Sequence, residues 1–192
     1  RLTHIWLNHG DSDKAANYSA RHAAFDKVFV SGQQGVERYA DHGVRIRPEQ
    51  FALVGRPQIE RIATRDKPPA PGGPRTVLYA PTWHGGKPNT NYSSLFLGPK
   101  IIDALLAHGA TVIFRPHPQT YNDPDQTRLA QEIQHRLGAD RKATGRQHVF
   151  GHAAEVDWDI PACFNHCDAL ITDVSSVASD FLATGKPLAT VA

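Results

Sequence analysis

The sequence predicts an α/β fold in which most strands are parallel. Two observations carry this prediction. Short runs rich in β-branched and other apolar residues alternate along the chain with segments that have helical periodicity. Glycine or proline closes the helical segments, as in other helices that lead into strands. The expected strands cover residues 3–7, 27–30, 51–54, 76–80, 111–114, 148–150, 169–172 and 188–191.

Three segments between the later strands have helical patterns. The first covers residues 99–108, with four apolar residues on one face, and Gly109 ends it. The third covers residues 176–184 and ends before Gly185. In the second, an apolar residue recurs at every fourth position, at Leu129, Ile133 and Leu137. Each helix therefore has a stripe that can pack on the sheet.

Residues 64–74, TRDKPPAPGGP, interrupt the pattern because proline and glycine are unsuited to the interior of a helix or strand. We interpret this segment as an interdomain linker. Residues 1–63 are then the last part of one Rossmann-like domain, and residues 75–192 most of a second. The chain opens at Arg1 and stops in an expected strand, so we expect it to be an excerpt of a longer protein.

The composition is that of a soluble globular protein. Of 192 residues, 40% are hydrophobic and 21% charged, with no continuous apolar stretch that could span a membrane. The net charge is +2, and the basic residues are scattered, which argues against nucleic acid as a partner. The two cysteines, Cys163 and Cys167, are too close in sequence to staple distant segments, which fits a reducing cytoplasm.

The segment ALITDVSSVASDFL places polar residues where a buried strand gives way to a helix. Ligands of open α/β sheets bind at this end of the strands, and the first turn of a helix offers free N–H groups to phosphate. Thr172, Asp173, Ser175 and Ser176 are therefore candidates for a phosphate or pyrophosphate site. Capping of the helix by Asp173 or Ser175 explains the same residues without a ligand.

The strand at residues 111–114 runs into Arg115-Pro116-His117-Pro118. Two prolines restrict the backbone, so a guanidinium and an imidazole are presented at the sheet edge with little freedom left to lose. This arrangement suits a diphosphate, since arginine offers a fork of donors and protonated histidine adds another. A proline-rich turn with two solvated side chains is the alternative.

Two further loops carry histidine and lysine after a strand. The loop that follows residues 76–80 contains His84 and Lys87 among glycines, but it matches no known phosphate-loop spacing. The segment HGDSDK holds His9, Ser12 and Lys14, where His9 stands clear of the sheet and could accept a proton from a substrate hydroxyl. A turn capped by aspartate explains this second loop equally well.

Six segments occur in the order of the landmarks of the CDP-glycerol glycerophosphotransferase family, which the sequence therefore resembles. They are HGDSDK, FDKVFVSGQQGVERY, VGRPQIERI, VLYAPTWHGG, IFRPHP and ALITDVSSVASDFLATGKPLATVA. The resemblance implies a GT-B architecture of two Rossmann-like domains, with the acceptor domain incomplete here. It implies transfer of glycerol phosphate from CDP-glycerol, or a related CDP-linked donor, to a hydroxyl of a teichoic-acid-like polymer or glycan, with release of CMP. It also implies a cytoplasmic protein peripheral to the inner face of the cell membrane. We expect no cofactor, and we assign no residue as a metal ligand.

Carried over by position, the resemblance assigns His9 as the catalytic base, with Ser12 and Lys14 on the acceptor side. His117 would share in catalysis and donor binding. The donor diphosphate would be held by Arg115, His117, Thr172, Asp173, Ser175 and Ser176. The family often reads TWR where this chain has Trp83-His84, so His84 or Lys87 would replace an arginine, or the donor differs. We expect the chain alone to be inactive, since most of the acceptor wall is missing.

Two alternatives stay open. A GT-B glycosyltransferase or a sugar-nucleotide epimerase shares the fold and the diphosphate site, and fold alone does not separate these reactions. A zinc-stabilised interaction module is the alternative of another class, because five histidine and cysteine residues cluster within twenty positions. They are His148, His152, Cys163, His166 and Cys167.

Overall fold

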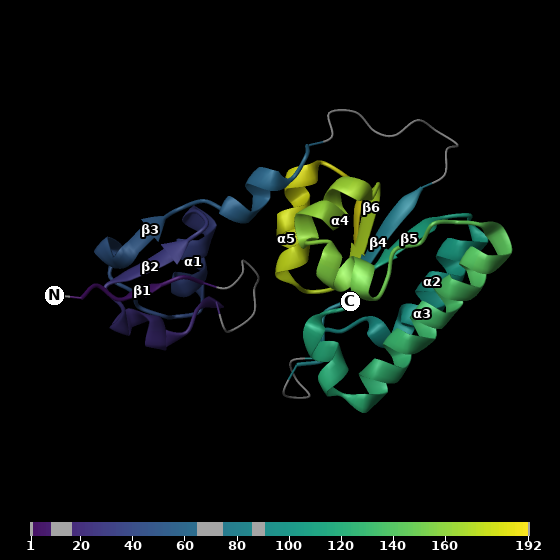
Figure 1. Ribbon diagram of the computed structural model, residues 1–192. Coiled ribbons are helices and arrows are strands. Elements are labelled where there is room, and N and C mark those ends of the chain that lie inside the picture. Colours follow the sequence, from purple (N-terminus) through teal and green to yellow (C-terminus); the bar gives the residue numbers. More distant parts are fainter. Residues whose placement is uncertain (1, 9–16, 65–74, 86–90, 192) are drawn as a thin grey trace. The chain divides into compact units, whose positions relative to one another are not determined.

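The computed structural model of the protein describes residues 2–8, 17–64, 75–85 and 91–191 (Figure 1). The chain divides into two units, Arg1–Glu60 and Arg61–Ala192, each with its own parallel sheet. Four predicted site residues, His9, Ser12, Lys14 and Lys87, lie outside the described residues.

The first unit holds a three-stranded parallel sheet in the order β1-β2-β3, formed by Ile5–Trp6, Lys27–Val30 and Phe51–Leu53. Helix α1, Gln33–Asp41, connects β2 to β3 (Figure 1). Short 3₁₀ turns occupy Ala20–Ala24, Pro48–Gln50 and Pro57–Arg61. Val28, Val30 and Tyr39 form the core between sheet and helix, where the Tyr39 hydroxyl and His22 Nδ1 are 2.6 Å apart.

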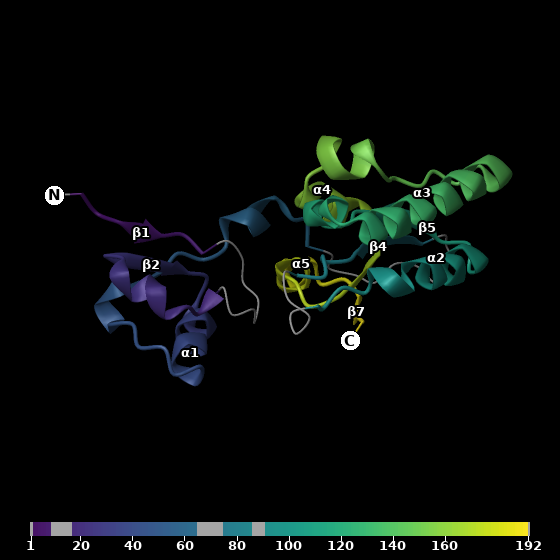
Figure 2. The ribbon, with the colours of Figure 1, turned by 90° about the horizontal axis from the view of Figure 1, so that it is seen from below.

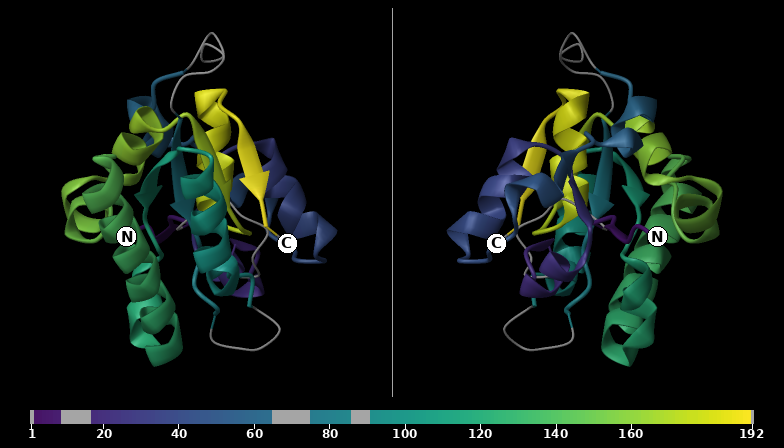
Figure 3. Two further views of the ribbon diagram at one scale, coloured as in Figure 1. Left: turned by 90° about the vertical axis from the view of Figure 1, so that its right-hand side faces the viewer. Right: turned by 90° about the vertical axis from the view of Figure 1, so that its left-hand side faces the viewer.

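The second unit holds a four-stranded parallel sheet in the order β5-β4-β6-β7. Its strands are β4 Thr76–Ala80, β5 Thr111–Phe114, β6 Ala169–Thr172 and β7 Leu188–Thr190. Strand β4 is central, with Tyr79 opposite both Phe114 and Ile171. Strand β7 lies at one edge of the sheet and is the last strand of the chain (Figure 3).

Helices cover both faces of this sheet, because successive residues of a strand point to opposite sides. Tyr79 and Phe114 pack against α2, Gly98–Ala107, and α3, Pro124–Thr144, which lie beside each other (Figures 1 and 2). On the other face, Leu78 packs against α4, Ile160–His166, and α5, Ser176–Phe181. Among the described residues of this unit there are also short helical turns, a π-helical turn at Ala153–Asp157 and 3₁₀ turns at Leu95–Leu97, Pro118–Asn122 and Leu182–Thr184.

The α/β class with parallel sheets is confirmed, and three local predictions need correction. Residues 148–150 do not form a strand, because their pairing is limited to a single bridge between Val149 and Ile113. The helix around Ile133 is longer than its apolar spacing indicated, running from the Asp123 cap to Gly145, whose φ of 77° suits glycine. The helix predicted for residues 176–184 changes to a 3₁₀ turn at Leu182–Thr184.

The chain enters the second unit just before the predicted linker. Arg61 forms an ion pair with Asp159 at 2.6 Å, and its carbonyl accepts a hydrogen bond from Asn165 Nδ2 at 3.0 Å. Asn165 Oδ1 in turn accepts from the Ala63 N–H at 2.8 Å. These contacts tie residues 61–63 to α4. Among the helices of the described residues, none is both long and apolar enough to cross a membrane.

Candidate functional site

Three loops meet at the carboxyl ends of the second sheet, where they line a pocket of about 140 Å³. One side is formed by residues 80–82 after β4, and another by residues 115–118 after β5. Ser175, after β6, closes a third side. The pocket lies where open parallel sheets bind their ligands.

The strand order brings these loops together. Strand β4 pairs with β5 on one side and with β6 on the other, so the ends of all three strands are adjacent. Three sequence motifs that are more than thirty residues apart from one another are therefore neighbours in space. The sequence predicted this gathering of Arg115, His117 and Ser175.

Arg115 lines the pocket and also holds the turn at Ala153–Asp157. Its Nη1 donates hydrogen bonds to the carbonyl oxygens of Ala154 and, at 2.6 Å, of Trp158. Burial raises the pKa of Glu155 in the same turn, and the charge of Arg115 opposes that rise. The guanidinium is thus anchored to the backbone through one nitrogen while it borders the pocket.

His117 is exposed and caps the 3₁₀ turn that follows it. Its Nδ1 accepts a hydrogen bond from the Gln119 N–H at 3.1 Å, so the neutral ring carries its proton on Nε2. Its own N–H donates to the Pro81 carbonyl at 3.1 Å, which joins the loops after β4 and β5. The ring stacks on Trp83 with a centroid separation of 6.2 Å.

His84 is held in a geometry that suits its protonated form. Nδ1 lies 2.5 Å from the Gly85 carbonyl, and Nε2 lies 3.1 Å from Asp123 Oδ2. Because both ring nitrogens face acceptors, the contacts favour the protonated ring, and the Gly85 carbonyl and then Asp123 raise the pKa of His84. The pKa of Asp123 is lowered, first by the Gln126 N–H that it caps and then by His84.

Asp173 is fully buried and does not cap α5. Its carboxylate accepts from the Thr82 N–H at 2.9 and 3.1 Å, and from the Ser94 N–H and hydroxyl at 2.8 and 2.9 Å. Thr172 is also buried, and its hydroxyl donates to the Ala80 carbonyl at 2.6 Å. The side chains of Thr172 and Asp173 therefore form hydrogen bonds within the protein, to the end of β4 and the loop that follows it.

Ser175 occupies the position before α5, and no hydrogen bond from its side chain caps the helix. Its hydroxyl lies 3.4 Å from that of Thr172 and borders the pocket. Ser176 is the first residue of α5. Of the four candidates in this segment, Ser175 is the one that lines the pocket, and Thr172 and Asp173 lie behind it.

Sequence reasoning missed two residues that organise the site. Asp123 is the partner of His84 and caps α3, and an aspartate before a proline at a helix start could have indicated it. Ser94 binds Asp173, but nothing in its local sequence signals a contact with a residue 79 positions away.

The five residues of the zinc alternative have separate roles. Cys163 and Cys167 are free thiols inside the core. His148 Nε2 is 2.8 Å from Asp140 Oδ2, His152 pairs with Asp157 at 3.2 Å, and His166 Nδ1 is 2.8 Å from the Ala162 carbonyl oxygen. Within the described ranges, no group of three or more potential ligands could hold a metal ion. The structure therefore gives the zinc module no support.

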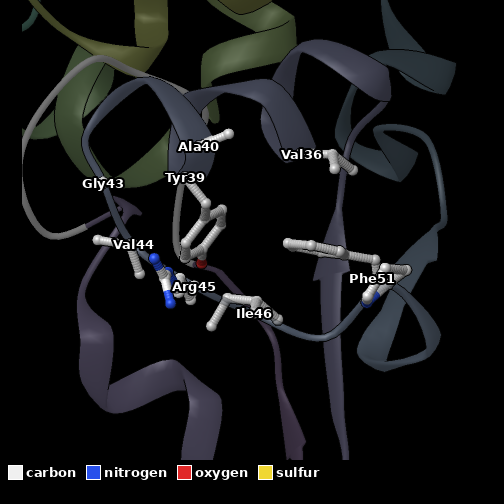
Figure 4. A pocket seen from close by; sticks show the side chains of 9 residues that line it. Val36, Tyr39, Ala40, Gly43, Val44, Arg45, Ile46 and Phe51 are labelled. Carbon is white, nitrogen blue, oxygen red and sulfur yellow. The ribbon is translucent and has the colours of Figure 1, made fainter.

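A larger pocket of about 620 Å³ lies in the first unit, beside α1 (Figure 4). Its lining is mostly apolar, and the rings of Tyr39 and Phe51 face it together with Val36 and Ile46 (Figure 4). Arg45 is the charged residue of its lining. It contains none of the residues that the sequence predicted as functional, so the smaller pocket is the candidate site.

Solved structures share this fold. A variant of the wall teichoic acid polymerase TagF soaked with CDPG matches with a TM-score of 0.52 at 16% identity, over 97% of this chain and 43% of that chain. A putative UDP-N-acetylglucosamine 2-epimerase from Listeria monocytogenes matches with a TM-score of 0.52 at 16% identity, over 88% of this chain and 43% of that chain. The chain thus spans less than half the length of these proteins, and no curated protein matches it.

The parallel α/β units therefore correspond in fold to about half of a GT-B transferase. The model of the family described as CDP-Glycerol:Poly(glycerophosphate) glycerophosphotransferase matches residues 11–192. The chain belongs to that family.

Proposed function

We propose that the chain carries the donor-binding part of a transferase that moves glycerol phosphate from CDP-glycerol to a hydroxyl of a polyol-phosphate or glycan acceptor. The observation that carries this proposal is the pocket where Arg115, His117 and Ser175 meet at the carboxyl ends of a parallel sheet. Family membership makes a CDP-linked donor the natural ligand of such a pocket.

The pocket has the chemistry of a diphosphate site. Arg115 provides a permanent positive charge, and the Nε2–H of His117 and the Ser175 hydroxyl are donors. In its protonated form His84 adds a second positive charge on the loop after β4, although both of its ring nitrogens are already engaged. In this proposal His84 therefore acts through its charge and its hold on the loop, and Arg115, His117 and Ser175 contact the phosphates.

The proposed reaction assigns a role to each of these residues. An acceptor hydroxyl attacks the β-phosphorus of CDP-glycerol in line with the bond to the bridging oxygen, that bond breaks, and CMP leaves. Arg115 and His117 stabilise the charge that develops on the leaving phosphate. The hydroxyl proton goes to a base, and the family resemblance assigns this role to His9, with Ser12 and Lys14 beside the acceptor. Thr172, Asp173 and Ser176 support the pocket, and Lys87 stays a candidate phosphate ligand.

The domain assignment also stays a proposal, in which the first unit is part of an acceptor domain. Apolar side chains are exposed at the ends of its strands, with Leu7, just after β1, at 66% and Leu53, the last residue of β3, at 57%. Parallel sheets are normally covered on both faces, so these side chains favour a larger domain in the parent protein. In that parent, we expect the protein to act at the cytoplasmic face of the cell membrane, where its polymer acceptor is made.

The test is a titration of the 192-residue chain with CDP-glycerol, CDP-ribitol, CMP and a UDP-sugar, followed by isothermal calorimetry. We expect the CDP-linked donors and CMP to bind more tightly than the UDP-sugar. Preference for the UDP-sugar would favour a glycosyltransferase or epimerase, which is the alternative function. If all four ligands bind with equal affinity, and that affinity falls as salt is added, then the pocket attracts anions through charge alone and the proposal is refuted.

A second experiment addresses the base in the full-length parent. His9→Ala is expected to lower turnover by roughly 10²- to 10⁴-fold, as for a lost general base, with donor affinity nearly unchanged. Full turnover together with a collapse of donor affinity would move His9 to the donor site. The chain alone is expected to bind CMP without catalysing transfer, and robust transfer by it would contradict the assignment of the two domains.

A further inference from the structure

We infer that Asp173 is a positioning residue that holds the loop after β4 in the shape of the donor pocket, and is not itself a phosphate ligand. The inference rests on the proposed function for the identity of the ligand. Its physical basis is the hydrogen-bond network of Asp173, which joins three segments of the second unit.

The carboxylate lies at the end of β6, fully buried. Both of its oxygens face the Thr82 N–H, and Oδ2 also accepts from the N–H and hydroxyl of Ser94. Buried carboxylates are costly unless such donors satisfy them, so this network defines one orientation of the side chain. In that orientation the carboxylate faces Thr82 and Ser94. The nearby side chain that lines the pocket is that of Ser175.

The network fixes Thr82 on both sides of its backbone. While Asp173 accepts from the Thr82 N–H, the Ser93 hydroxyl donates to the Thr82 carbonyl at 2.7 Å. Thr82 and its neighbour Pro81 line the pocket. The position of this side of the pocket therefore depends on Asp173 and on the segment that contains Ser93 and Ser94.

The same loop carries the effect to His117. The Pro81 carbonyl accepts the His117 N–H at 3.1 Å, so a shift of residues 81–82 displaces the histidine as well. Proximity of a negative carboxylate to a diphosphate would oppose binding, and the donors around Asp173 offset this charge. Asp173 thus contributes to donor binding through geometry, by setting the distance between Thr82 and His117.

Asp168 provides a matched control at the other end of the same strand. Its Oδ2 accepts from the Thr76 N–H at 2.9 Å, which is also a bond from an aspartate to the backbone of β4. Asp173→Asn and Asp168→Asn therefore make the same chemical change on the same pair of strands. Asp173 lies at the carboxyl end, beside the pocket, and is fully buried, whereas Asp168 lies at the amino end and is half-buried.

The experiment measures CDP affinity by calorimetry and the amide signals of Thr82, Ser94 and His117 by ¹H–¹⁵N NMR in both variants of the 192-residue chain. For Asp173→Asn we expect displaced amide signals and a dissociation constant raised by about tenfold or more, since an amide replaces two acceptors with one. For Asp168→Asn we expect a lower melting temperature with CDP affinity within about twofold of the wild type.

Three results would overturn the inference. Weaker CDP binding with unchanged amide signals would mean that Asp173 contacts the ligand. Displaced signals with unchanged affinity would remove any role in binding. An equal loss of CDP affinity in both variants would mean that Asp173 affects binding only through the overall stability of the fold.

Two contingencies keep the test decisive. If Asp173→Asn does not fold, Ser94→Ala, which removes one donor to the carboxylate, decides: a folded variant with affinity lowered by about two- to fivefold supports the inference, and unchanged affinity overturns it. If the wild type does not bind CDP, the proposed donor is wrong. The positioning role is then judged by the His117 signal in Asp173→Asn, where displacement supports the role and constancy refutes it.

Discussion

His117 offers a direct test of the donor pocket, because it is exposed and its removal should leave the fold intact. Its Nδ1 accepts the Gln119 N–H at 3.1 Å, so the neutral ring carries its proton on Nε2, and we expect this N–H to donate to a phosphate oxygen of the donor. A hydrogen bond to a charged group contributes about 1.5–3 kcal/mol. His117→Ala should therefore raise the dissociation constant of CDP by about 10- to 150-fold.

The control must separate this contact from the cap. Asparagine is a good cap acceptor, so His117→Asn should preserve the turn at Pro118–Asn122 while it removes the imidazole. We expect calorimetry to show similar losses of CDP affinity in His117→Asn and His117→Ala. His135→Ala, at an exposed histidine of α3 away from the pocket lining, should bind like the wild type. Wild-type affinity in His117→Asn would refute the reasoning, since the ring would then serve only as a cap.

Three further predictions concern the structure around the site. Asp140→Ala should lower the free energy of unfolding by about 1–3 kcal/mol in urea denaturation without changing CDP affinity, because it leaves the Nε2–H of the buried His148 ring without its acceptor; an unchanged free energy of unfolding would contradict this. The raised pKa of His84 adds stability that is present below its ordinary pKa and is lost as the pH rises through the raised one. Asp123→Asn keeps an acceptor for the α3 cap but removes the negative charge beside His84, so NMR titration should show a lower pKa of His84. An unchanged pKa of His84 would show that Asp123 does not stabilise its protonated form. Burial raises the pKa of Cys167 to about 11, so iodoacetamide should modify it slowly in the folded chain and rapidly in urea, and fast reaction of the folded chain would contradict its burial.

Sequence reasoning predicted that Arg115, His117 and Ser175 lie near one another, but it left the direction of Asp173 open. Arg115 and His117 follow one strand, and Ser175 follows another, so their meeting at one sheet edge could be predicted from the rule that parallel strands end on the same side. Asp173 shared that motif, but its direction was open, because a residue just past a strand can face either the ligand or the protein. Donors from Thr82 and Ser94 decided that it faces the protein.

The local sequence pattern also predicted a strand at residues 148–150 that does not form. Residues 148–150 have β-forming side chains, yet their pairing is a single bridge at Val149. His148 is drawn into a polar network instead, with Nδ1 accepting the Val112 N–H at 3.0 Å and Nε2 at 2.8 Å from Asp140. Such pairings depend on the far ends of other elements, which a window of neighbouring residues does not contain.

The amino-acid sequence by itself determined the α/β class, the positions along the chain of seven of the eight expected strands, and the resemblance to the family to which the chain belongs. These properties follow from periodicity and from the order of motifs, and both are local. Only the tertiary structure decided the strand order β5-β4-β6-β7, the anchoring of Arg115 to the Trp158 carbonyl, and the inward direction of Asp173. The physical reason is that buried polar groups take whichever donors and acceptors the packed fold brings near them, and those partners are distant in sequence.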